Sequence, residues 1–248
     1  HQSAFVLQEE DRMMLQNEAA AYEMALFNAL PILNREDVFI ELGNRFTFYS
    51  ATDRVYWSPR LNIRYDYHQQ AYLKGAFTRA NQFVREFVYN NRLGQSLTFF
   101  TLSNQDEFPV GHSNNYMLGN HWARGPWSLD LELYKKDFWG LIEYARLFQG
   151  FDPEEINPGR QREYAIFNGK GNTHGLDVML SLNRTNYQGW LSYTWSKTLH
   201  EFRAIYRGAA FPAQDDRRHQ INWVNHYHWK ALDLSATYVM ASGRPFLD

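Results

Sequence analysis

The chain has 248 residues, a formal net charge of −2 and no cysteine. The near balance of charge provides no basic surface for nucleic acid, and the missing cysteines exclude a disulfide framework, a thiolate nucleophile and a cysteine-based zinc site. Aromatic residues make up 17% of the chain, an excess that fits a β-protein better than a helical one. No apolar run approaches the roughly 20 residues that a membrane-spanning helix needs, whereas a barrel strand needs only about ten residues of alternating polarity.

A period of two in polarity recurs along the whole chain and predicts β-strands. In the segment from Val55 to Tyr67 the odd positions are almost wholly apolar, and the even positions carry charge at three or four places. The same alternation recurs at 38–48, 129–134, 176–182, 191–196, 218–229 and 232–240. In chain order we expect about eleven strands, over residues 3–12, 17–30, 36–50, 55–68, 71–84, 114–124, 127–146, 161–183, 188–202, 217–229 and 231–243.

The predicted connections alternate between short and long. Short links fall at 68–70, 123–126, 184–186 and Lys230, and long links at 85–113, 147–160 and 203–215. Rings lie beside the short links (Trp127, Trp190, Tyr227 and Trp229) and near the opposite strand ends (Tyr49, Tyr56 and Trp57). Tight turns at one side, long loops at the other and two aromatic girdles are typical of outer-membrane barrels.

A soluble β-sandwich or soluble barrel also has alternating strands and is the competing interpretation. Three features favour the membrane barrel. The strands often reach 13 residues or more, whereas soluble strands average about five or six. The polar face carries charges, as a water-filled lumen would, and the connections alternate in length. We therefore predict an all-β fold, an antiparallel transmembrane β-barrel.

Five ordered motifs in the C-terminal half resemble the barrel of TonB-dependent outer-membrane receptors, particularly those common in Bacteroidetes-type bacteria. They are LDLELYKK (129–136), FNGKGNTHGLD (167–177), LSYTWSK (191–197), PAQDDRRHQIN (212–222) and YVMASGRP (238–245). The earlier part is similar more loosely, through Ser58-Pro59-Arg60-Leu61 and Asn81-Gln82-Phe83. Each motif alone is weak, but the ordered set is fairly specific and covers most of the chain.

The resemblance implies a plugged barrel of 22 strands in the outer membrane of a Gram-negative bacterium. It implies uptake of a scarce solute, such as a siderophore, glycan or peptide, with energy from TonB, and it implies no catalytic residue and no cofactor. A surface lipoprotein caps the barrel in some relatives. Because eleven strands are half of such a barrel, we expect residues 1–248 to be a partial barrel domain without the plug domain and the last strands.

The long loop at 85–113 is the best ligand candidate, because rings among amides suit sugars, peptides or aromatic chelates equally. Its candidate residues, together with two arginines considered as anion contacts, are Phe87, Tyr89, Phe99, Phe100, Phe108, Arg217 and Arg218. The alternative to a ligand site, rated equally, is that these rings pack within the loop itself. For the arginines, which follow Asp215 and Asp216, a structural charge network is the favoured interpretation.

Three other patterns favour structural interpretations. His226 and His228 share a strand face but lack an evident third metal ligand. Asp152, Glu154 and Glu155 lie in a proline-bounded loop, without the fixed separation that glycoside hydrolysis requires. Gly169-Lys170-Gly171 lacks the full phosphate-loop pattern, and its glycines are expected to permit a bend or bulge in a long strand.

Two other functions compete with the receptor at this stage. A soluble carbohydrate-binding or carbohydrate-active β-protein would use the rings as sugar platforms. A passive porin-like barrel would lack a plug domain.

Overall fold

In the structure, a computed structural model, residues 23–34, 37–90, 96–104, 108–146 and 164–245 are described. They form thirteen strands and one short 3-10 helix, η1 (Tyr206–Gly208). The strands are β1 (Glu23–Asn34), β2 (Val38–Tyr49), β3 (Arg54–His68), β4 (Ala71–Gln82), β5 (Val84–Asn90), β6 (Ser96–Leu102), β7 (Gly111–Arg124), β8 (Trp127–Arg146), β9 (Tyr164–Arg184), β10 (Tyr187–Phe202), β11 (Phe211–Pro212), β12 (His219–Trp229) and β13 (Leu232–Ala241). No helix in these ranges is long and apolar enough to cross a membrane.

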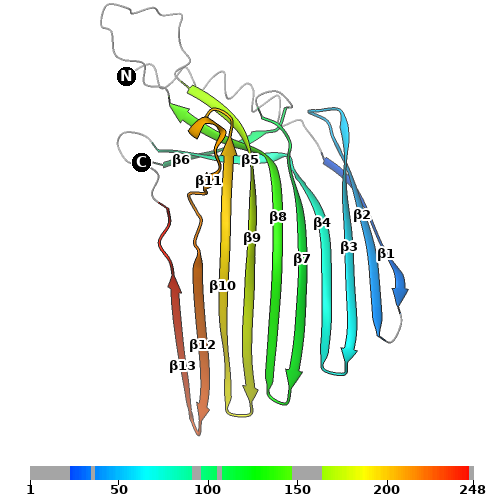
Figure 1. The fold of residues 1–248 in the computed structure, drawn as a ribbon, viewed down its shortest axis with the longest axis vertical. Coiled ribbons are helices and arrows are strands. Elements are labelled where there is room, and N and C mark those ends of the chain that lie inside the picture. The colour runs from blue at the N-terminus through cyan, green and yellow to red at the C-terminus, as the bar shows by residue number, and fades with distance from the viewer. Residues whose placement is uncertain (1–22, 35–36, 91–95, 105–107, 147–163, 246–248) are drawn as a thin grey trace, which may run out of the picture.

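Eleven of the strands form one antiparallel sheet in the order β1-β2-β3-β4-β7-β8-β9-β10-β12-β13, with the short β11 paired to β10. The long strands run side by side, and the tight turns lie together at their lower ends (Figure 1). Strands β5 and β6 form a separate two-stranded sheet inserted between β4 and β7. Apart from these insertions, neighbours along the chain are neighbours in the sheet, which is the up-and-down order of a barrel wall.

Most of the predicted strands are confirmed to within a few residues. The first predicted strand, 3–12, lies outside the described residues, and the second, 17–30, is found in its described part as β1. Two predictions of plain loop are wrong. The segment 85–113 contains the β5–β6 hairpin, and 203–215 contains η1 and β11.

Two-residue turns join β3 to β4, β7 to β8, β9 to β10 and β12 to β13. Gly125 and Lys230 have φ angles of 58° and 56° in two of these turns. Positive φ in a two-residue turn matches the twist of the flanking strands, which is why glycine suits the first of these positions. Lys230 adopts the same conformation at some cost in strain.

The strand register separates an apolar face from a polar face, because directly opposed residues point to the same side of a sheet. Leu133 lies opposite Leu176, and Leu176 lies opposite Trp195 on the next strand. Phe46 lies opposite Trp57, with their rings stacked 6.5 Å apart. The alternation read from the sequence therefore continues across neighbouring strands as rows.

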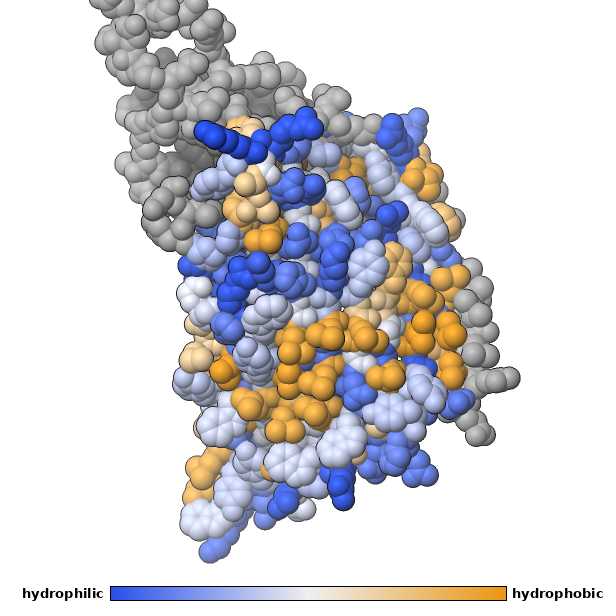
Figure 2. Space-filling view, in the orientation of Figure 1, coloured by the Kyte–Doolittle hydropathy of each residue, from blue (hydrophilic) through white to orange (hydrophobic). Residues whose placement is uncertain are grey.

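The apolar face is left uncovered by the residues that the structure describes. Leu118 and Leu133 are 59% and 56% exposed, and many other large apolar residues are also exposed. Figure 2 shows hydrophobic residues gathered in a band across the middle of one face, with a hydrophilic area above them. Within the described residues no second layer packs on this band, whereas a β-sandwich buries the apolar faces of its sheets against each other.

The predicted aromatic girdles are partly confirmed. Trp127, Tyr227 and Trp229 are exposed beside the tight turns. Three assignments are wrong. Trp190 lies opposite Ser181 and Val224, on the polar face. Tyr49 is only 3% exposed and packs on Phe83, with the ring centroids 4.7 Å apart. Tyr56 lies opposite Thr47 on the same polar face and packs edge-on against Phe83 at 5.1 Å.

Candidate functional site

The polar face carries a charge network on β4, β7 and β8 near the tight turns. Lys74 Nζ forms an ion pair with Glu132 Oε1 and lies 3.9 Å from Asp130 Oδ1. His121 Nδ1 lies 3.0 Å from the same Asp130 oxygen. The strand register explains why the Lys74 and Glu132 side chains meet. Lys74 lies opposite Gly119, and Gly119 lies opposite Glu132. Glycine leaves room for the Lys74 side chain to cross β7.

Stacked rings extend this network to β3. The Arg64 guanidinium lies 4.1 Å from the centre of the Tyr72 ring, and Tyr72 stacks on the His121 ring at 4.7 Å. Arg64 Nε also donates to Asp66 Oδ1 at 2.8 Å. Four adjacent strands thus share one continuous polar surface, which suits a wall that faces water rather than lipid.

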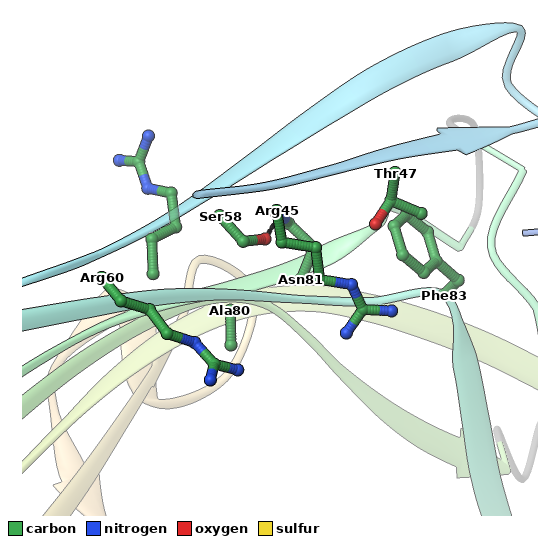
Figure 3. A pocket seen from close by; sticks show the side chains of 8 residues that line it. Arg45, Thr47, Ser58, Arg60, Ala80, Asn81 and Phe83 are labelled. Atoms are coloured by element: carbon green, nitrogen blue, oxygen red, sulfur yellow. Dashed lines mark hydrogen bonds between the residues drawn. The ribbon is translucent and has the colours of Figure 1, made fainter. Parts of the chain in front are cut away.

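Further along the strands, a hollow of about 300 Å³, part of which is open solvent, is lined by Arg45, Thr47, Ser58, Arg60, Arg79, Ala80, Asn81 and Phe83 (Figure 3). Asn81 Nδ2 donates to Ser58 Oγ at 2.9 Å across the strands. The Arg45 and Arg60 side chains extend to the same side of the sheet (Figure 3). Two guanidinium groups beside a solvent-filled hollow suit an anionic group of a solute or of another protein segment.

An aromatic cluster lies where β10 and β11 pair, and it was missed by the sequence reasoning. Phe211 lies opposite His200, and its ring is 6.1 Å from Phe202 and 5.1 Å from Tyr206. Phe202 is 1% exposed, whereas Tyr206 is 50% exposed. The cluster therefore anchors this end of the connection while leaving one ring at the surface. The available signal was Phe202 at the end of a predicted strand and Phe211 within the segment predicted as loop.

Arg217 and Arg218, for which a structural charge network was favoured over an anion contact, have different surroundings. Arg218 Nε lies 2.8 Å from the buried carboxylate of Asp216, whose other oxygen accepts the Thr198 backbone N–H at 2.9 Å. Arg218 thus belongs to a network that fixes the connection to β10. Arg217 accepts a hydrogen bond through its carbonyl oxygen from Ser196 Oγ at 3.1 Å.

The ring candidates of the long loop are distributed over the β5–β6 hairpin and the segment after it. Phe87 and Phe99 are backbone partners across the hairpin, and Phe100 is 56% exposed. Tyr89 lies opposite Leu97. The backbone N–H of Phe108 donates to Asn104 Oδ1 at 3.1 Å. The structure thus places Phe87, Tyr89, Phe99 and Phe100 on one hairpin, whereas Phe108 lies in the connection to β7.

His226 and His228 face the β13 strand. His228 Nδ1 lies 2.8 Å from Asp233 Oδ1, and His226 Nδ1 lies 3.0 Å from Ser235 Oγ. Across the residues that the structure describes, no group of three histidine or carboxylate side chains is arranged to hold a metal ion. The acidic cluster of Asp152, Glu154 and Glu155 lies outside those residues.

Gly169 and Gly171 make room for aromatic rings instead of permitting the expected bulge. A Cβ atom on Gly169 would lie 2.5 Å from the Phe202 ring, and one on Gly171 would overlap the Phe138 ring. The register shift occurs on the partner strand β8, between Trp139 and Leu141.

Comparison with solved structures relates this wall to outer-membrane receptors. The FrpB iron transporter from Neisseria meningitidis matches with a TM-score of 0.60 at 13% identity, over 94% of this chain and 35% of its own. The ferripyoverdine receptor of the outer membrane of Pseudomonas aeruginosa matches with a TM-score of 0.59 at 14% identity, over 89% and 31%. The siderophore receptor PirA from Pseudomonas aeruginosa matches with a TM-score of 0.55 at 16% identity, over 89% and 41%.

No protein-family model and no curated protein sequence matches the chain. The chain spans less than half the length of each of these three structural relatives. At these identities the likeness concerns the fold. Together with the alternating rows and the apolar face that the described residues leave uncovered, it identifies the fold as an antiparallel strand wall like those of the barrels in these solved structures.

Proposed function

We propose that residues 1–248 form part of the barrel wall of an outer-membrane receptor that takes up a scarce solute with energy supplied through TonB. The observation that carries the proposal is the separation of faces. Rows of exposed leucine, tyrosine and tryptophan suit lipid, and the Lys74–Glu132 network on the opposite face suits a wet lumen. Transport requires no catalytic residue in the wall, so we propose a receptor that is not an enzyme.

The remainder of the barrel would come from outside the described residues. Within them, β1 pairs only with β2, and β13 pairs only with β12. Unpaired strand edges are costly in a bilayer, where no water satisfies the backbone groups. We therefore propose that further strands close the wall and that a plug domain fills it.

A ferric chelate is the first class of solute to test, because the matched structures are described as a siderophore receptor, an iron transporter and a ferripyoverdine receptor. The hollow beside Arg45 and Arg60 would offer positive charge to an acidic chelate from the wall side. Glycans and peptides remain the competing cargoes, and the Bacteroidetes-type origin and a capping lipoprotein remain predictions.

A deletion of the full-length gene tests this proposal. The protein should fractionate with the outer membrane, and the deletion strain should lose growth on one limiting solute among a panel of ferric chelates, glycans and peptides. Removing TonB should reproduce the same loss in the wild-type strain. Uptake that continues without TonB would support a passive pore, and a protein found in the soluble fraction would overturn the membrane assignment.

A further inference from the structure

We infer that the lipid-facing side of β8, β9 and β10 carries a binding site for the phosphate groups of an outer-leaflet lipid. The site is the basic row, which consists of Lys135, His174 and Lys197. The register places these three residues directly opposite one another on adjacent strands. The inference rests on the proposed outer-membrane location, and it assigns a partner to one part of the barrel's outer surface.

The basic row lies immediately above the apolar band. The row one step nearer the tight turns is Leu133, Leu176 and Trp195, which is the same side of the sheet. Lys135 therefore lies on the apolar, lipid-facing side of β8 and not on the charged lumen side. A change from leucine to lysine and histidine within one step on neighbouring strands is the pattern expected where hydrocarbon gives way to headgroups.

The height of the row above the tight turns agrees with this position. Lys135 lies eight residues beyond Trp127, the first residue of β8, and Lys197 lies ten residues beyond Tyr187, the first residue of β10. At about 3.4 Å per residue and a tilt of about 40°, these separations correspond to roughly 21 and 26 Å along the membrane normal. The apolar band of such barrels is about 25 Å tall, so the row lies at its outer border.

The row is only partly neutralised within the described wall. Lys135 Nζ pairs with Asp137 at 2.9 Å, and the neighbouring Lys170 pairs with Glu201 at 3.1 Å. Lys197 forms no ion pair with any described residue, and the His174 ring lies 5.7 Å from the Trp195 ring. A phosphate group from the membrane would supply the counter-charge that Lys197 lacks within the described wall.

Phosphate suits an unpaired lysine because its oxygens accept charge-assisted hydrogen bonds from the ammonium group. A neutral headgroup would not offset the charge of Lys197.

Native mass spectrometry of the full-length protein in detergent tests the inference, with diphosphoryl lipid A and its dephosphorylated form as probes. We expect the wild type to retain the phosphorylated lipid selectively. The K197Q variant should bind it roughly five-fold more weakly and K135Q/K197Q roughly 25-fold more weakly, on the basis of about 1 kcal/mol for each lysine near an anionic surface. The K197R variant should retain binding.

The matched control is K136Q, because Lys136 is the next residue on β8 and lies opposite Asn115 and Thr173 on the lumen side. K136Q should bind like the wild type. Equal loss in K136Q, equal retention of the dephosphorylated lipid, or complete displacement by millimolar inorganic phosphate would overturn the inference. Membrane fractionation of the same variants reports on the proposed function separately, since a receptor in the outer membrane with unchanged lipid binding contradicts only the lipid site.

Discussion

Lys74 and Glu132 form an ion pair across three strands although 58 positions separate them in the sequence. Lys74 extends from β4 over Gly119 of β7 to reach β8. The pair links β4 to β8, which the chain connects through the β5–β6 insertion, β7 and one tight turn. It also places balanced charge on the face that we assign to the lumen.

Replacing Lys74 by methionine should lower the stability of the barrel, because Asp130 and Glu132 then lose their shared cation. We expect a loss of about 1 kcal/mol, since the pair is partly screened by solvent. Urea unfolding of the full-length protein in lipid vesicles measures this change. Lys170→Met is the control, because the Lys170–Glu201 pair is more exposed and should contribute little. Equal losses in the two variants would contradict the assigned role of the Lys74 network.

Two adjacent residues on β10 should differ in how much stability the barrel loses when each is replaced by arginine. Leu191 lies in the apolar band, whereas Ser192 lies on the polar face and accepts a hydrogen bond from Asn222. Leu191→Arg should cost about 2–4 kcal/mol in the same vesicle assay, as charges on the lipid face of barrels do near the bilayer centre. Ser192→Arg should cost much less. A reversed order would mean that the two faces have been assigned to the wrong solvents.

Gly171→Ala should destabilise β9 through a steric conflict. A Cβ atom there would overlap the Phe138 ring and lie 2.6 Å from the Leu199 carbonyl oxygen. We expect a cost of roughly 1–3 kcal/mol. Gly243→Ala serves as the comparison, because a Cβ atom at Gly243 meets no atom within 4 Å. Similar urea midpoints for both variants would show that the rings have room to move.

Asp216→Ala should release the connection between β10 and β12. The carboxylate is 3% exposed, pairs with Arg218 and accepts the Thr198 N–H, so its loss should cost about 1–3 kcal/mol locally. Hydrogen exchange should then be faster at Thr198 and through 203–215. Asp215→Ala, at a highly exposed carboxylate paired only at 3.3 Å with Arg244, should leave exchange unchanged. Unchanged exchange in Asp216→Ala would remove its anchoring role.

The wall was predictable from the sequence because each strand carries its own signal. The alternation from Val55 to Tyr67 fixes which residues share a face, and tight turns with Gly125 or Asn186 limit the possible registers. The same local rules gave the assignment of Arg218 to a charge network, since Asp216 lies two positions away.

The site features depend on contacts that no local pattern contains. Lys74 meets Glu132 because β4 pairs with β7 in the main sheet while β5 and β6 form a separate hairpin. That hairpin was predicted as loop because its strands are short. Tyr49 was expected at the membrane surface, but its position on the polar face brings it onto Phe83. Gly169 and Gly171 were predicted to permit a bend or bulge, because the rings that occupy the space beside them come from other strands.

The most direct test of the account is a scan of β10 by site-directed spin labelling from Gln188 to Ser196. The chain has no native cysteine, so single cysteines can be introduced in turn in the full-length protein in lipid vesicles. Labels at odd positions should collide mainly with oxygen, which concentrates in lipid, and labels at even positions mainly with a water-soluble nickel chelate. An alternation of period two with this phase is the predicted result. The absence of alternation, or the opposite phase, would contradict a wall with lipid on one side and water on the other.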